Sequence, residues 1–287
     1  MNKELEEVLQ RLGALLPQPA PATDWSASIA FRWRASARRG AARGDAGWLH
    51  PVRQVHRIRL ADLRGIDKQI ERVEQNTRQF LHGRPANNVL LTGARGTGKS
   101  SIVKGLLNKY AKQGLRLIEV EKNDLVDLPQ IVDQVAARPE RFLLFCDDLS
   151  FHGAEDGYIA LKVALDGSVS TTSENMLIYA TSNRRHLMPE YMAENLETKY
   201  IGDEIHPGET VEEKISLSER FGLWVTFYPF DQDEYLEIVA YWLKTLGAKW
   251  NDAAREEALQ WSLQRGSRSG RVAYQFARDW AGRHSKK

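Results

Sequence analysis

The chain has 287 residues, 42% of them hydrophobic and 27% charged, and its 40 Lys and Arg nearly balance its 38 Asp and Glu. These values are typical of soluble globular proteins, argue against a disordered or fibrous chain, and leave room for one large domain with an appendage or for two domains. No apolar run reaches the roughly 20 residues of a membrane span, the first 16 residues carry three Glu instead of a basic leader, and the single Cys146 cannot form an internal disulfide. We therefore expect a cytoplasmic protein.

The first part of the chain is expected to stand apart from the main fold. Residues 3–16 carry apolar side chains at helical spacing, and the three prolines of residues 17–23 end that helix, which predicts a short amphipathic helix on an extended linker. Residues 27–35 then favour a short strand, and a flexible loop follows it.

Residues 25–60 are rich in arginine: they hold eight Arg and a single acidic residue, Asp45. Together with Trp25, Trp33 and Trp48, this composition is one way to hold nucleic acid, because arginine contacts phosphate and aromatic rings stack on bases. Two alternatives remain open. The arginines could dock on the rest of the chain, which is slightly acidic, or on a neighbouring subunit, and the tryptophans could belong to the core.

From residue 60 onward, short apolar runs rich in β-favouring residues alternate with helical segments. This alternation predicts an α/β fold with a five-stranded parallel sheet that helices cover on both faces. The five runs are residues 88–92, 115–120, 142–146, 176–181 and 223–228. After Pro229 three helical stretches follow, at about residues 231–247, 251–264 and 270–283. We therefore divide the chain into an N-terminal segment (1–59), an α/β nucleotide-binding domain (60–229) and a small helical domain (230–287).

The strongest local motif follows the first of these runs and matches the phosphate-binding pattern G-x-x-x-x-G-K-[ST], the P-loop. Glycines in such a loop let backbone N–H groups surround a phosphate, the lysine reaches the β and γ oxygens, and the final hydroxyl binds Mg²⁺. The alternative is a glycine-rich turn that only caps the helix predicted at 101–112. The predicted site for ATP and Mg²⁺ consists of Gly93, Ala94, Arg95, Gly96, Thr97, Gly98, Lys99, Ser100 and Ser101.

Two carboxylates, Asp147 and Asp148, directly follow the buried run 142–146. Parallel α/β sheets present ligand-binding groups at this end of their strands, and neither carboxylate can be buried unpaired. We expect Asp147 to hold the Mg²⁺ through water and Asp148 to polarise the attacking water. The alternative is a helix cap at the end of the strand.

This order of a strand with a P-loop, an acidic strand end and a strand running into Asn183 resembles the AAA+ ATPases, and the resemblance covers residues 60–283. Several separate blocks are also similar to a bacterial AAA+ group described as a domain of unknown function. These blocks read NNVLLTGARGTGKSS, FCDDLSF, YATSNRRHL, EKISLSERFG and GSRSGRVAYQF. The resemblance implies an AAA+ core with a helical lid, but no defined biological role.

The resemblance also implies roles for residues outside the P-loop. Asn183 matches the sensor 1 residue, which orients the lytic water near the γ-phosphate. An amide at the end of a buried strand has little use in a core, and its alternative is a cap on the following helix. Gly65 and Ile66 match the segment that lines the adenine pocket, where Ile66 would pack on the base. Their alternative is a simple turn before a helix.

Two arginines complete the implied site. Arg271 matches sensor 2, a lid arginine that contacts the phosphates, although Arg265 and Arg268 crowd the same turn. Arg220 matches the arginine finger of AAA+ rings, as in Holliday-junction branch-migration motors, which reaches the γ-phosphate held by the next subunit. A finger of this kind implies a homo-oligomer, either a ring or an arc. The alternative is a surface Arg220 paired with Glu219 or Glu213.

One position departs from the AAA+ pattern, since most of these motors carry Glu where this chain has the shorter Asp148. The leading hypothesis is an ATPase that hydrolyses Mg-ATP at subunit interfaces to remodel or switch a macromolecular partner. Because a shorter carboxylate fits slow turnover, the alternative is an adaptor or loader that binds ATP, hydrolyses it poorly and recruits protein or nucleic acid through its N-terminal arm. The helical lid and Arg220 disfavour a third class, a small-molecule kinase.

Overall fold

The computed structural model describes residues 22–35, 47–151, 156–166, 174–183, 199–201, 204–206 and 217–284. The helix expected at 3–16, most of the proline-rich linker and the loop expected after the first strand lie outside these residues. Among the helices that are described, none has both the length and the apolar character that a membrane crossing requires.

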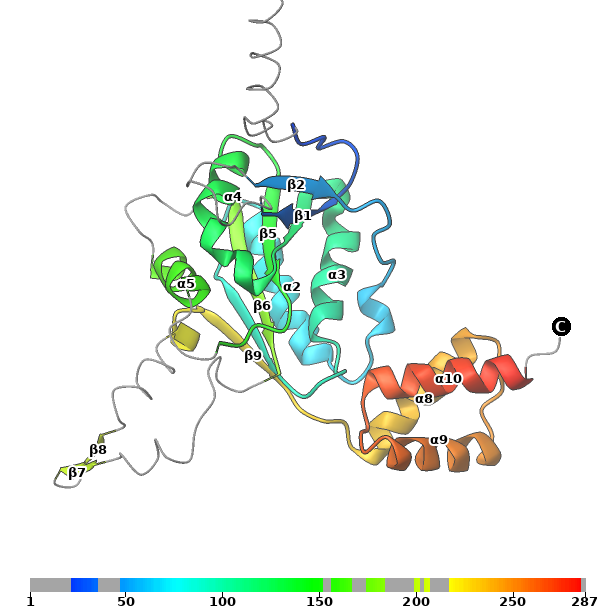
Figure 1. Cartoon of the computed structure of the whole chain (residues 1–287). Helices are drawn as coiled ribbons and strands as arrows, with labels where there is room; N and C mark the ends of the chain where they lie inside the picture. The colour runs from blue at the N-terminus through cyan, green and yellow to red at the C-terminus, as the bar shows by residue number, and fades with distance from the viewer. Residues whose placement is uncertain are drawn as a thin grey trace, which may run out of the picture.

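A sheet of seven strands lies at the centre of the molecule, in the order β2-β1-β4-β5-β6-β3-β9 (Figure 1). Six of them are parallel, and five of these six coincide with the five predicted runs, which confirms the predicted fold class. These five strands are β3 (Val89–Gly93), β4 (Leu115–Glu119), β5 (Arg141–Cys146), β6 (Met176–Ser182) and β9 (Leu223–Phe227). A separate two-stranded sheet pairs β7 (Lys199–Ile201) with β8 (Glu204–His206).

The strand expected within residues 27–35 also joins this sheet. β1 (Ala30–Arg34) pairs parallel with β4, and β2 (Trp48–Pro51) pairs antiparallel with β1. Part of the segment 1–59 therefore extends the sheet on the side of β4.

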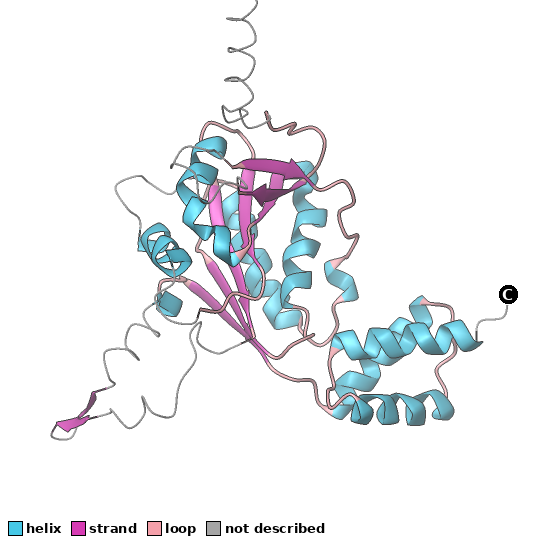
Figure 2. Cartoon of the chain, viewed as in Figure 1, coloured by secondary structure: helices cyan, strands magenta, loops and turns pink. Residues whose placement is uncertain are grey.

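Helices cover both faces of the sheet (Figure 2), and its central strands are therefore buried on both sides. In β3, Val89 and Leu91 point into one core and Leu90 into the other, as the two-residue period of a strand requires. The helices are α2 (Asp67–Leu81) and α3 (Lys99–Tyr110) on one face, and α4 (Leu128–Val135) and α5 (Asp156–Asp166) on the other. Three 3-10 turns connect elements of the domain: η1 (Leu60–Asp62), η2 (Ala111–Gln113) and η3 (Lys122–Asp127).

Two of the N-terminal tryptophans belong to the core. Trp33 is 1% exposed, and its indole Nε1 donates a hydrogen bond to the carboxylate of Asp127 (2.9 Å). Trp25 packs against two phenylalanine rings of the same core. Trp48, in the edge strand β2, is half-buried. Two of the three tryptophans that could have formed a stacking surface for bases therefore pack in the core instead.

Three helices follow β9, close to the predicted helical stretches, and lie beside the sheet domain (Figure 1). They are α8 (Gln232–Thr245), α9 (Asp252–Gln264) and α10 (Gly270–His284). Asp231 caps α8 in a reciprocal capping box with Glu234, and Asn251 caps α9 by accepting a hydrogen bond from the backbone N–H of Ala254 (2.8 Å). These caps explain where the two helices begin.

Candidate functional site

The loop between β3 and α3 forms a cradle because its glycines adopt backbone angles that other residues avoid. Gly93, Gly96 and Gly98 have φ angles of 118°, 75° and 107°. A Cβ atom on Gly93 would lie 1.9 Å from the carbonyl oxygen of Phe227 at the end of β9. The backbone N–H of Ala94 donates a hydrogen bond to that same oxygen (3.1 Å), so β9 holds the start of the loop.

The other residues of the P-loop differ in how far they are exposed to solvent. Thr97 is buried, and its hydroxyl donates to the carbonyl of Ala94 (2.8 Å). Arg95 is exposed at the tip of the loop. Ser100 and Ser101 lie in the first turn of α3, where the backbone N–H groups of a helix are free to bind an anion.

Lys99 begins α3 and is only 5% exposed. Its Nζ donates to the carbonyl oxygens of residues 93 and 94 (2.8 and 2.7 Å) and to the amide oxygen of Asn183 (3.0 Å). Burial lowers the pKa of Lys99 to about 8, while the carboxylates of Asp147 and Asp148 oppose that shift. A buried ammonium whose acceptors are neutral oxygens favours an anionic ligand.

The two carboxylates lie opposite this lysine, at the end of β5. The hydroxyl of Ser100 donates to the carboxylate of Asp147. Thr181, near the end of the adjacent strand β6, donates to the same oxygen (2.6 Å) and accepts a hydrogen bond from the backbone N–H of Asp148 (2.9 Å). A hydroxyl beside a carboxylate is an oxygen donor set of the kind that Mg²⁺ takes, so the residues present fit this ion.

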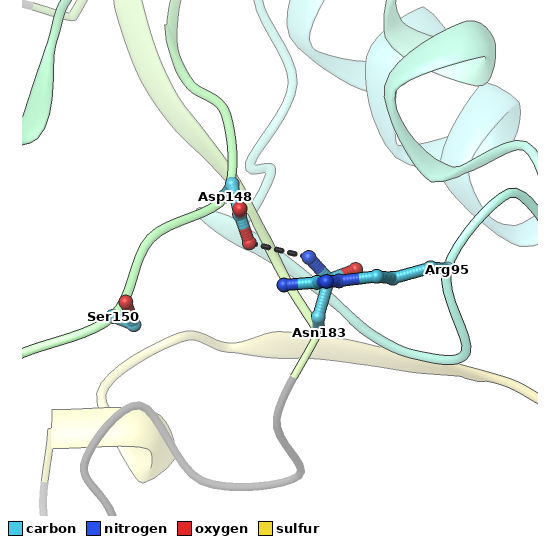
Figure 3. A pocket seen from close by; sticks show the side chains of 4 residues that line it. All are labelled: Arg95, Asp148, Ser150 and Asn183. Carbon is cyan, nitrogen blue, oxygen red and sulfur yellow. Dashed lines mark hydrogen bonds between the residues drawn. The ribbon is translucent and has the colours of Figure 1, made fainter.

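Asp148 has a strained backbone. Its φ of 54° makes it the one non-glycine residue with a positive φ in the described part of the chain, a conformation that costs an L-residue about 1–2 kcal/mol. The carboxylate accepts a hydrogen bond from the side-chain amide of Asn183 (Figure 3). The two residues line a cavity of about 290 Å³ together with Arg95 and Ser150. Strain of this size is frequent at functional sites.

The first turn of α10 contacts the P-loop. The backbone N–H of Arg271 donates to the carbonyl of Gly96 (3.2 Å), and a Cβ atom on Gly96 would lie 2.8 Å from the hydroxyl of Ser269. The other two arginines of this region have different contacts: Arg265 lies over the ring of Trp261 (3.6 Å), and Arg268 contacts the side chain of Gln232 (3.5 Å). Arg271 is thus the member of the trio beside the cradle.

Gly65 and Ile66 lie where the P-loop, α2 and the connection to α8 meet. Ile66 is 3% exposed, and its Cδ1 would be 2.9 Å from a Cβ atom on Gly98. Gly65 has a φ of 74°, and the ring of Phe230 packs against it. This pair therefore borders the cradle next to the connection that leads to the helical domain.

Arg220 is the one predicted site residue that lies away from the cradle of its own chain. It precedes β9, whose opposite end contacts the P-loop through Phe227, and the four residue steps along this strand, at about 3.3 Å each, separate its two ends by roughly 13 Å. Its guanidinium pairs with the carboxylate of Asp166 at the end of α5. The other predicted residues come together around the P-loop.

Sequence reasoning missed two residues of this arrangement, Thr181 and Ser269. A signal was available for Thr181: it precedes Asn183 by two residues, and residues two apart in a strand share one face. No local signal marked Ser269, because its role depends on the packing of α10 against the P-loop.

Comparison with known proteins identifies the family and the fold. The family described as "Protein of unknown function (DUF815)" matches residues 26–284. A search of curated proteins finds no match. Among solved structures, the AAA domain of FIGL-1 in complex with ADP superposes with a TM-score of 0.50 at 18% identity, covering 79% of this chain and 74% of that one. This likeness shows an AAA+ fold.

The Holliday junction branch migration motor RuvB of Thermotoga maritima is a second similar structure. It has a TM-score of 0.48 and 16% identity, and the match covers 78% of this chain and 64% of that one. The chain thus spans 64% of the length of the RuvB chain that it matches.

Proposed function

We propose that this chain, which belongs to the DUF815 family and has an AAA+ fold, binds Mg-ATP in the cradle between β3 and α3 and hydrolyses it. The observation that carries this proposal is the buried Lys99, whose ammonium joins the carbonyls of a left-handed glycine loop to Asn183. Its ammonium lies at the loop that leads into α3, a helix whose first N–H groups are free to bind an anion. A triphosphate supplies the negative charge that this arrangement favours.

Two residues are proposed to hold the metal ion. Ser100 and Asp147 already lie within hydrogen-bond distance of each other, and Asp147 would act through water. When bound, Mg²⁺ would draw negative charge from the β and γ oxygens. Gly65 and Ile66 would line the site of the adenine base.

Asp148 is the proposed general base, which polarises the attacking water and accepts its proton. Asn183 positions this carboxylate, since its amide donates to Asp148 while its oxygen accepts from Lys99. One side chain thus connects the phosphate cradle to the base. Arg271 would contact the phosphates and couple the angle between the helical lid (230–287) and the α/β domain (60–229) to the nucleotide state.

Arg220 is proposed to act on the nucleotide of a neighbouring subunit, because its own cradle lies at the other end of β9. This role requires a homo-oligomer, a ring or an arc, with ATP hydrolysed at subunit interfaces. The work of the assembly would be to remodel or switch a macromolecular partner in the cytoplasm. A second candidate function is a slow or non-hydrolysing adaptor, which the short, hydrogen-bonded carboxylate of Asp148 favours.

Two variants test this proposal. Lys99→Ala should lose both ATP binding and turnover, because among the described residues Lys99 is the one cation hydrogen-bonded to the loop carbonyls. Asp148→Asn should keep binding and lose about 10²–10⁴ in turnover, because the amide preserves the shape and removes the base. Binding of a fluorescent ATP analogue and release of phosphate measure the two steps separately.

Each outcome tests one of the assigned roles. Near-normal hydrolysis by Lys99→Ala would contradict the P-loop assignment. If Asp148→Asn lost binding together with turnover, Asp148 would be a metal ligand or a structural residue. Turnover by the unsubstituted protein no faster than that of Asp148→Asn would favour the adaptor.

A further inference from the structure

The strands β1 and β2 lie next to α3 at one edge of the sheet (Figure 1). Ala30 points into the core below α3, so the strand period places Arg32 and Arg34 on that same face. His50 lies directly opposite Arg32 in the antiparallel pair and shares its side. Both Arg34 and His50 are exposed.

The loop that follows β2 continues this surface along α3. The backbone N–H of Val52 donates to the carbonyl of Ala30 (2.9 Å), and the side-chain amide of Asn108 in α3 donates to the carbonyls of His56 and Ile58 (both 2.9 Å). Lys104 lies one turn before Asn108 on the same side of α3. We define the cationic surface as Arg34, His50, Arg53, His56, Arg57 and Lys104.

The charge of this surface is not neutralised within the described residues. Residues 47–59 contain no Asp or Glu. Two carboxylates of the adjoining elements already have cationic partners, since Glu119 pairs with Arg32 and Asp62 pairs with Arg59. The four permanent charges of the cationic surface, those of Arg34, Arg53, Arg57 and Lys104, form no ion pair among the residues that the structure describes.

The chemistry of this surface distinguishes nucleic acid from an acidic protein as its partner. The core of a protein–protein interface is apolar, whereas nucleic-acid interfaces are polar and positively charged. The exposed large apolar side chains of the described chain lie elsewhere, at Val126, Ile159, Val163, Tyr228, Leu246, Trp250, Leu263 and Tyr274. We propose that the cationic surface binds the phosphate backbone of nucleic acid. This proposal goes beyond the ATPase function and does not depend on it.

The expected signature is electrostatic. Four permanent charges that neutralise four phosphates of a single strand predict a slope of about −3 when log K is plotted against log salt concentration. Anisotropy of a fluorescein-labelled single strand of about 20 nucleotides, titrated with the full chain between about 50 and 200 mM salt, measures this slope. The variant Arg53→Gln/Arg57→Gln should bind about tenfold or more weakly at low salt, and its slope should fall to about −1.4.

A matched control removes the same charge from another surface. Lys244→Gln/Lys249→Gln acts at the end of α8 and in the loop after it, and should leave both affinity and slope unchanged. Thermal unfolding and ATP binding of both double variants verify the fold. The proposal fails if the unsubstituted protein does not bind at low salt, if both double variants weaken binding equally, or if an oligoglutamate of matched length displaces the strand while the Arg53→Gln/Arg57→Gln slope stays unchanged.

Discussion

The hydroxyl of Thr181 is hydrogen-bonded to both acidic residues of the candidate site. It donates to Asp147 (2.6 Å) and accepts the backbone N–H of Asp148 (2.9 Å), the residue with the strained φ of 54°. Thr181→Val keeps the shape of the side chain and removes the hydroxyl. We expect ATP turnover to fall by about 10- to 100-fold and the Mg²⁺ concentration for half-maximal activity to rise, because groups that orient a metal ligand have effects of this size.

Thr181→Ser is the matched control for this prediction. It retains the hydroxyl and should keep turnover and Mg²⁺ dependence close to those of the unsubstituted protein. Titration of turnover with Mg²⁺ for both variants measures the difference. Equal losses in the two variants would mean that the methyl group of Thr181, and not its hydroxyl, is what the site needs.

At the scale of elements, the P-loop depends on the close approach of β3 and β9. A Cβ atom on Gly93 would lie 1.9 Å from the carbonyl oxygen of Phe227, to which the loop is hydrogen-bonded through Ala94. Gly93→Ala should therefore lower the free energy of unfolding by about 3 kcal/mol or more and weaken ATP binding, because β9 has to move or the loop has to deform. Denaturant unfolding and ATP titration measure the two effects.

Gly114→Ala separates the clash from the cost of the backbone angle. Gly114 also has a positive φ, 93°, but a Cβ atom there would meet nothing within 4 Å. Its substitution should cost about 1–2 kcal/mol and leave ATP binding unchanged. If the two variants lost the same stability, the contact of β3 with β9 would not be the constraint on Gly93.

Arg220 lies about one strand length from the cradle of its own chain, so the prediction for this residue concerns the assembly of several subunits. Arg220→Ala should bind ATP normally and hydrolyse it about 10³- to 10⁵-fold more slowly, as loss of an arginine finger does. Mixing it with Lys99→Ala subunits should restore part of the turnover, because some interfaces then combine an intact cradle with an intact finger. Phosphate release by mixtures shown by sizing to form mixed oligomers measures the rescue.

The ion pair with Asp166 supplies the control for this experiment. Asp166→Asn removes one ion-pair partner of Arg220 within its own chain and keeps the arginine. If Arg220 acts in a neighbouring subunit, Asp166→Asn should retain most of the turnover. If Asp166→Asn is as inactive as Arg220→Ala and the mixture shows no rescue, Arg220 has a structural role in its own subunit.

The nucleotide site could be located from the sequence to a considerable extent. The P-loop spacing, the acidic end of the run 142–146 and the amide at Asn183 are local features, and parallel strands gather their carboxyl ends at one edge of a sheet. Thr181 escaped notice because threonine is common in strands for reasons of packing. The strand β2 escaped because it is four residues long and pairs at an edge, where the apolar pattern is weak.

The sequence by itself determined the succession along the chain of five parallel strands and the helices that alternate with or follow them, because apolar periodicity and the residues that cap or break elements are properties of neighbouring positions. Tertiary structure alone decided that β1 and β2 extend the sheet beside β4, that Arg271 lies at Gly96 while Arg265 lies on Trp261, and that Asn183 connects Lys99 to Asp148. Each of these contacts joins elements whose separation along the chain says nothing about their relative position, since that position depends on strand order and on how α10 packs against the loop.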